Sequence, residues 1–324
     1  MKCIVVNCSK GYSLGSRKLY NWLLEQGNEV SYTDTDPGMF LTDFDLVCLS
    51  VVFSWDVKKA RDIALRVRGN SDMWAGGPGF AALKNWWKKE TGLECTYRVD
   101  ERFEHQRGNY ERTFASRGCP IGCSFCNVRL IEGKEFVFNY DFQPAPMLGD
   151  NNISALPVDF QEHIVKRYLE SGIKLKDAEN GFEPRSFDDD TYYRWLPIMK
   201  NVVWRFGFDE TNESEYVERM MKILLKEPRP SHKKAFVLIG NEPMEMCYKR
   251  IIKTIEWGGE PFAKPVIALN ALDRKPMINY DWTERKLMDM TQWANRWYWR
   301  KTPLKEYLSL KNQGPTFANE TWLK

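Results

Sequence analysis

Histidine is nearly absent from this chain of 324 residues, which has only His105, His163 and His232. All three follow residue 104, so the N-terminal third offers no imidazole to a metal ion. Long apolar runs are also missing, and stretches such as Leu46 to Phe53 are too short to cross a bilayer. Met1 to Cys8 has the pattern of a strand and not of a secretory signal. These absences predict a cytoplasmic protein with no membrane partner.

A strong charge imbalance is lacking too. The net charge of +3 is too small to indicate nucleic acid as a partner by itself. Hydrophobic residues make up 43% and charged residues 28%, which is typical of a globular protein. The length is sufficient for two domains with apolar cores.

Cysteine is present in a specific pattern. Cys119, Cys123 and Cys126 have C-x3-C-x2-C spacing. Three thiolates can hold three irons of a [4Fe–4S] cluster and leave the fourth iron open to a ligand. Three ligands of a structural zinc, or three unrelated buried thiols, are the alternatives, but no second pair of cysteines completes a zinc site. Of the other five cysteines, those at positions 3, 8 and 48 lie in apolar strand-like runs and are expected to be buried.

The N-terminal hundred residues predict an open, parallel α/β sheet. Apolar strand-like runs alternate with helical periodicity. The expected strands are 2–7, 29–33, 45–53 and 73–75, and the expected helices are 16–26 and 56–68.

A second alternation of strands and helices follows. Its expected strands are 110–116, 146–148, one within 173–187, 202–208, 235–239 and 265–269, with helices at 158–171, 215–226 and 242–257. This order predicts a partial (β/α)6 barrel of the TIM type, whose chemistry gathers at the carboxyl ends of the strands. We expect three parts: residues 1–104, the barrel 105–275 and a helical extension 276–324.

The run Ser116 to Cys126, with Phe125 before the last cysteine and Glu132-Gly133 beyond it, resembles the signature of the radical S-adenosylmethionine (SAM) enzymes. It is most similar to the branch with an N-terminal cobalamin-binding-like, flavodoxin-like domain. The resemblance implies a [4Fe–4S] cluster on the three cysteines. Its open iron binds SAM, and one electron cleaves SAM to methionine and a 5′-deoxyadenosyl radical. It also implies a reductant such as flavodoxin or ferredoxin, and a small-molecule, peptide or nucleic-acid substrate.

The same resemblance assigns SAM-contacting residues. Phe125 would lie near the adenine, Asp150 and Asn151 near the amino group, and Glu179, Asn180 and Arg185 near the ribose and carboxylate. Arg205, Ile239 and Gly240 complete the candidates. Alternatively, Asp150 and Asn151 only form a turn, Glu179 pairs with Arg185, and Arg205 pairs with a carboxylate of a neighbouring strand.

Cobalamin is not expected in this chain. The cobalamin ligand of such domains is a histidine in D-x-H-x-x-G, and residues 1–104 contain none. The domain also has little sequence for a complete fifth strand and helix. We therefore expect a vestigial domain, in which the loop of Gly76, Gly77 and Gly79 either approaches a ligand or forms a plain tight turn. A cobalamin-dependent methyltransferase and a non-catalytic iron–sulfur scaffold remain the alternatives.

The C-terminal region is rich in tryptophan and arginine. Residues 283–299 have helical periodicity, with Trp293 and Trp297 on one face at i, i+4. Aromatic and basic side chains together can clamp nucleic acid, but we expect this helix to pack its aromatic rings on the barrel.

Overall fold

The computed structural model describes residues 1–310. The chain forms two compact units, one from Met1–Pro146 with Ala268–Lys275 and one from Met147–Ile267 with the segment that begins at Pro276. Within residues 1–310, no helix is both long enough and apolar enough to span a bilayer.

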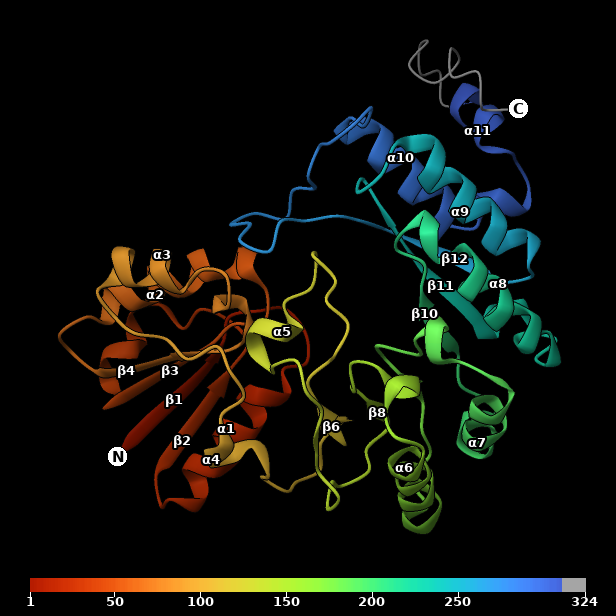
Figure 1. Cartoon of the computed structure of the whole chain (residues 1–324). Coiled ribbons are helices and arrows are strands. Elements are labelled where there is room, and N and C mark those ends of the chain that lie inside the picture. The colour runs from red at the N-terminus through yellow and green to blue at the C-terminus, as the bar shows by residue number, and fades with distance from the viewer. Residues whose placement is uncertain (311–324) are drawn as a thin grey trace. The chain divides into compact units, whose positions relative to one another are not determined.

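The first unit contains a four-stranded parallel sheet in the order β2-β1-β3-β4 (Figure 1). Its strands are β1 (Lys2–Asn7), β2 (Glu29–Thr33), β3 (Leu46–Ser50) and β4 (Asp72–Gly76), and its main helices are α1 (Leu14–Glu25), α2 (Val57–Val67) and α3 (Lys84–Thr91). This order is flavodoxin-like, as predicted.

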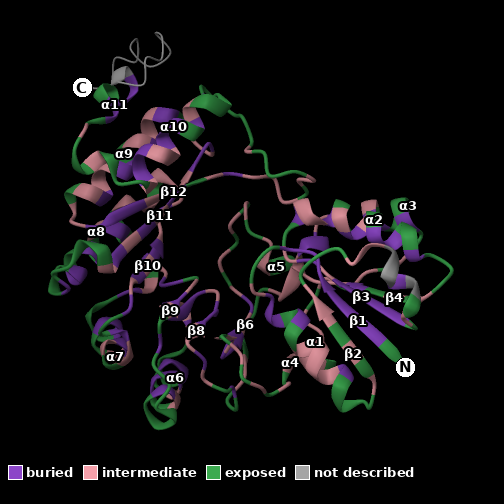
Figure 2. Cartoon of the chain, turned by 180° about the vertical axis from the view of Figure 1, so that it is seen from behind, coloured by how far each residue is buried: buried purple, intermediate pink, exposed green. Residues whose placement is uncertain are grey.

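Both faces of this sheet are buried. Cys3 and Val5 of β1 pack with Leu23 of α1, whereas Ile4 and Val6 join the core that α2 covers. Figure 2 shows β1 and β3 coloured mainly as buried. Cys3, Cys8 and Cys48 are buried as expected, because a parallel strand covered on both faces is apolar throughout.

The fifth strand of a flavodoxin-like sheet is reduced to one residue here. Thr96 makes a single parallel bridge to Gly76. At Gly77, φ is +119°, and an added Cβ would lie 2.3 Å from the Val51 carbonyl oxygen. An added Cβ at Gly79 would lie 2.7 Å from the Val51 side chain. These two glycines therefore serve close packing of the loop on its own chain, which supports the tight-turn alternative.

The segment after this sheet differs from the predicted first barrel strand. Instead of a strand over 110–116, the structure has two short strands, β5 (Arg112–Thr113) and β6 (Ser116–Arg117). β6 pairs antiparallel with β7 (Val137–Phe138). The short helix α4 (Glu101–Glu104) precedes β5, and the short helix α5 (Val128–Ile131) lies between β6 and β7 in sequence. The prediction of one continuous strand was wrong, because β5 and β6 belong to different sheets.

The second unit contains parallel strands that alternate with helices. β8 (Met147–Leu148) pairs with β9 (Asp177–Ala178), and β10 (Trp204–Gly207), β11 (Lys233–Ile239) and β12 (Glu260–Pro265) pair in that order. A bridge between Phe182 and Phe206 joins the two groups. The helices are α6 (Val158–Ser171), α7 (Asp189–Met199), α8 (Ser214–Ile223), α9 (Met244–Glu256), α10 (Glu284–Asn295) and α11 (Leu304–Leu310).

The predicted strand at 265–269 is wrong, because the last strand is β12. Gly258, with φ +79°, follows the C-cap residue Trp257 of α9, so the chain enters the sheet already at Glu260. Pro265 then ends the pairing region, since it has no N–H to donate. Helix α7 was not predicted.

Helix α10 ends earlier than the sequence suggested. Trp293 is buried, and its indole N–H donates to the Thr302 carbonyl at 2.9 Å. Trp297 lies beyond the helix in the left-handed region, at φ +56°, and is 48% exposed. The predicted packing is confirmed for Trp293, but the shared face with Trp297 is wrong.

Candidate functional site

The cysteine loop is held at both ends by residues of the predicted signature. The Arg117 guanidinium donates to Glu132 Oε1 at 3.0 Å, and the Gly118 N–H donates to Glu132 Oε2 at 2.9 Å. The Cys119 N–H donates to the Gly133 carbonyl at 3.4 Å. Together with the β6–β7 pair, these bonds close the loop that carries all three cysteines.

A second ion pair anchors the same arginine. Arg117 also contacts the Glu104 carboxylate, at 2.7 Å, and its guanidinium lies 3.6 Å from the centroid of the Phe114 ring. Gly118 is required here, because its φ is +89° and an added Cβ would lie 2.0 Å from the Glu135 carbonyl oxygen. The loop is therefore fixed by charge pairs and by one backbone position that only glycine fits.

None of the three cysteines is fully buried. Cys119 and Cys123 are half-buried and Cys126 is exposed. The Val128 N–H, at the start of α5, donates to Cys126 Sγ at 3.5 Å. Within residues 1–310, no three His, Cys, Asp or Glu side chains converge as ligands of one metal ion. The thiols therefore share a loop, and their side chains must turn toward a common centre to hold a cluster.

The polar candidates after β8 and β9 lie on paired strands of the second unit. The Asn180 side chain donates to the Gly149 carbonyl at 2.7 Å, and the Glu179 N–H donates to the Leu148 carbonyl at 3.0 Å. Asp150 is fully buried. Parallel pairing thus brings the two predicted strand ends together.

The two arginine candidates have carboxylate partners. Arg185 contacts Glu183 at 2.9 Å and Glu213 at 2.7 Å, so it does not pair with Glu179. Arg205 contacts Asp177 of β9 at 2.8 Å. This is the alternative in which Arg205 pairs with a carboxylate of a neighbouring strand.

Ile239 and Gly240 lie at the carboxyl end of β11. The Ile239 side chain is fully buried. Gly240 has φ +92°, and an added Cβ would lie 3.4 Å from the Leu287 side chain. The Ile239 carbonyl accepts a hydrogen bond from the Val266 N–H at 3.0 Å.

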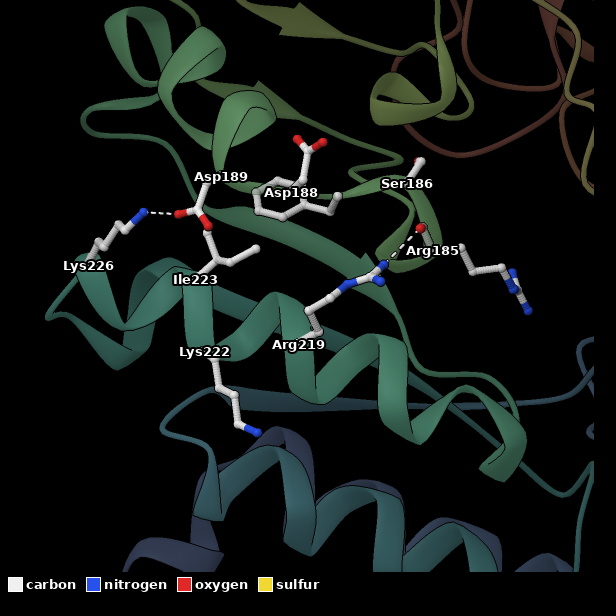
Figure 3. Close-up of a pocket in the computed structure, with 9 residues that line it drawn as sticks. Arg185, Ser186, Asp188, Asp189, Arg219, Lys222, Ile223 and Lys226 are labelled. Atoms are coloured by element: carbon white, nitrogen blue, oxygen red, sulfur yellow. Dashed lines mark hydrogen bonds and ion pairs between the residues drawn. The ribbon is translucent and has the colours of Figure 1, made fainter.

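A groove of about 550 Å³ lies beside Arg185 in the second unit (Figure 3). Arg219 crosses it and donates to the Arg185 carbonyl at 2.8 Å, while Lys226 pairs with Asp189. Lys222 pairs with Glu218 at 2.8 Å. Because these cationic side chains already pair within the chain, the groove has no evident binding or catalytic chemistry of its own.

Comparison with known proteins supplies the fold. No protein-family profile and no curated protein matches the sequence. Among solved structures, the chain matches the radical SAM methyltransferase TsrM from Kitasatospora setae, which was solved with cobalamin and a [4Fe–4S] cluster bound. The TM-score is 0.61 at 13% identity, over 81% of this chain and 74% of TsrM. The chain has the fold of TsrM. The predicted architecture, a flavodoxin-like domain followed by parallel strands of a partial barrel, is confirmed.

Sequence reasoning missed one group in this TsrM-like barrel as a site residue. Asp209 lies two residues beyond the end of β10 and is half-buried. Burial and the nearby Glu213 carboxylate raise the pKa of Asp209 to about 7, while Arg250 and Lys264 act in the opposite direction. Asp209 therefore titrates close to neutral pH. The only signal in the sequence was its position at the end of a strand.

Arg250 fixes the strand ends around Asp209. This arginine of α9 is 1% exposed and donates to the Phe208 carbonyl and, at 2.8 Å, to the Leu238 carbonyl. Its Nε lies 3.0 Å from Glu242 Oε2. The carboxyl ends of β10 and β11 are thus joined through one buried, charge-paired side chain.

Proposed function

We propose that this chain is a radical SAM enzyme. The observation that carries the proposal is the loop of Cys119, Cys123 and Cys126, closed by Arg117 and Glu132, in a chain with the fold of a radical SAM methyltransferase. The donor set fits a [4Fe–4S] cluster, because three thiols stand on one loop and none of the other five cysteines lies between residues 96 and 246.

The residues of the chain take distinct roles in this proposal. The three cysteines would hold the cluster, which when bound supplies the electron that cleaves SAM. Phe125, half-buried between two of them, would contact the adenine. Asp150, Asn151, Glu179 and Asn180, together with Arg185, Arg205, Ile239 and Gly240, are the proposed SAM contacts. An external reductant such as flavodoxin or ferredoxin completes the system, and the substrate is a small molecule, a peptide or a nucleic acid.

Anaerobic reconstitution with iron, sulfide and SAM tests the proposal. With dithionite, the wild type should bind about four irons and release 5′-deoxyadenosine. Cys123→Ala should lose both the iron and the product. Cys95→Ala is the matched control, because Cys95 is half-buried in the same unit but lies outside the loop. A wild type that binds iron yet forms no 5′-deoxyadenosine would indicate the non-catalytic scaffold instead.

A cobalamin-dependent methyltransferase is the second candidate. TsrM was solved with cobalamin bound, and the structural match covers 81% of this chain. Against it stand the lack of histidine in residues 1–104 and the glycine loop, in which Gly77 and Gly79 pack on Val51 rather than leave space for a ligand.

Anaerobic incubation with excess hydroxocobalamin, followed by desalting, separates the two functions. We expect well under one equivalent to remain on the protein, because no imidazole is available to the cobalt. Retention of one equivalent, with methyl transfer from SAM to a substrate, would establish the second candidate.

A further inference from the structure

The sheet β10–β12 has two unlike faces. One face is apolar and is covered by α9 and α10. Its buried residues include Trp204, Phe206, Ala235, Val237, Ile239 and Ala263, and the buried Lys233 at the start of β11 lies on the same face. The alternate residues form what we call the polar face: Arg205, Gly207, Lys234, Phe236, Leu238, Glu260, Phe262 and Lys264. Because successive side chains of a strand point to opposite faces, α9 and α10 do not cover the polar face.

The strand register makes Gly207 and Phe236 neighbours on the polar face. Gly207 of β10 pairs with Phe236 of β11, and Phe236 pairs with Phe262 of β12. Paired residues of adjacent strands are about 4.8 Å apart. A side chain that covers Gly207 is therefore adjacent to a side chain that covers Phe236.

Asp209 lies over Gly207. An added Cβ at Gly207 would be 2.9 Å from Asp209 Oδ2, so the carboxylate occupies the space that a side chain at 207 would need. The backbone of Asp209 is fixed on both sides. Its N–H donates to Glu213 Oε2 at 2.7 Å, and its carbonyl accepts from Asn241 Nδ2 at 2.6 Å.

Lys264 lies over Phe236. Its Nζ is 3.9 Å from the centroid of that ring, an arrangement that holds an ammonium group by cation–π attraction. Residues 1–310 provide no ion pair and no side-chain hydrogen bond to the Asp209 carboxylate or to the Lys264 ammonium. A carboxylate and an ammonium thus stand over neighbouring positions without forming an ion pair with each other.

We propose that Asp209 and Lys264 form a proton-transfer pair for the substrate of this enzyme. The substrate class is a molecule with a weakly acidic N–H or O–H group next to the reacting position. The inference rests on the proposed radical SAM function and adds the group that handles a proton.

The proposed step is a simple acid–base exchange. The substrate X–H bond breaks, its proton moves to Asp209 Oδ2, and the electron pair stays on X. The Lys264 ammonium then stabilises the X⁻ anion by charge and hydrogen bonding. The neutral Asp209 later returns its proton to the product or to water, so the step needs no oxidant or reductant.

The charges around the pair support this step. Desolvation lowers the pKa of the Lys264 ammonium, although the residue is exposed overall. The Asp209 carboxylate raises this pKa, and Arg205 lowers it. Burial raises the pKa of Asp209 most, Glu213 and Glu183 raise it further, and Arg250 and Lys264 lower it. A general base with a pKa near the working pH is the most effective one.

Infrared titration of the full-length chain tests the pair without any cofactor. The carboxyl band that is present in the wild type and absent from Asp209→Asn should titrate near pH 7. Lys264→Met should raise that pKa by about one unit, since a nearby cation is lost. Lys234→Met is the matched control, because Lys234 also faces a ring on the polar face, 6.0 Å from the Phe262 centroid, and should leave the pKa unchanged. The pairing is wrong if Asp209 titrates near pH 4, or if its pKa does not change in Lys264→Met.

Turnover tests the catalytic role separately. Reconstituted Asp209→Asn should keep its iron and its substrate-free cleavage of SAM. It should form the wild-type product, detected by mass spectrometry in a small-molecule cell extract, at least about 100-fold more slowly. Equal product formation by the variant, or an equal loss of SAM cleavage, would refute the role. If the wild type itself cleaves no SAM, the proposed function fails, and the infrared titration still decides whether Asp209 and Lys264 are coupled.

Discussion

Glu132 shows how one residue outside the cysteines can determine whether the loop is formed. Its carboxylate accepts hydrogen bonds from the Arg117 guanidinium and from the Gly118 N–H, and its side chain is 9% exposed. Hydrogen bonds to charged groups contribute more than neutral ones, about 1.5–3 kcal/mol each. The signature residues around the cysteines therefore have a structural role that is separate from ligation.

Glu132→Ala should lower the stability by about 2 kcal/mol, because Arg117 loses a partner and the Gly118 N–H loses its acceptor. It should also reduce the iron retained after reconstitution severalfold. Iron analysis and urea denaturation measure the two effects. Glu135→Ala is the control, since the Glu135 side chain is exposed. Unchanged iron in Glu132→Ala would show that the ion pair does not shape the loop.

At the scale of elements, helix ends decide which aromatic rings enter a core. The periodicity of residues 283–299 placed Trp293 and Trp297 together, but α10 ends at Asn295 and the chain turns at Trp297. Strand ends were misjudged for a related reason. The pairing of β11 with β12 begins at Lys234 and Glu260, directly after the Gly258–Gly259 turn. Hydrophobic patterns predict that an element exists better than they predict where it ends.

Trp293→Ala should lower the free energy of unfolding by about 3–5 kcal/mol, because it removes a buried ring and leaves the Thr302 carbonyl without its donor. Trp297→Ala should change stability by less than about 0.5 kcal/mol, as is usual for exposed positions. Thermal or urea unfolding monitored by circular dichroism measures both. Similar losses in the two variants would mean that α10 continues through Trp297.

For the whole molecule, the raised pKa of Asp209 makes stability depend on pH. The folded state holds this proton up to about pH 7, whereas an unfolded aspartate releases it near 4. Between these values the folded chain binds more protons than the unfolded chain, so the contribution of Asp209 to stability falls as pH rises.

Asp209→Asn should therefore gain stability over the wild type between pH 5 and 8. Because Asp209 is only half-buried, we expect a difference of about 1–2 kcal/mol at pH 8 and little at pH 4. Urea denaturation across this range measures it. A constant difference at all pH values would assign the effect to packing rather than to titration.

The sequence by itself determined the cysteine triad, the order of the four strands and of the helices α1 and α2 in the first hundred residues, and the fold that the match to TsrM shows, but not helix α3. These features depend on local spacing and on periodicity, which a chain carries without reference to distant residues. For the same reason, the sequence also indicated that residues 1–104 lack histidine and lack a complete fifth strand.

Only the tertiary structure decided which side chains meet. It showed that Arg185 pairs with Glu183 and Glu213, and that Arg205 pairs with Asp177. It also placed Asp209 over Gly207, beside the position where Lys264 lies over Phe236. Such pairs join residues that are up to 55 positions apart in sequence. Strand register sets the positions of Arg205 and Lys264, and a shift of one residue would turn these two side chains to the other face of the sheet.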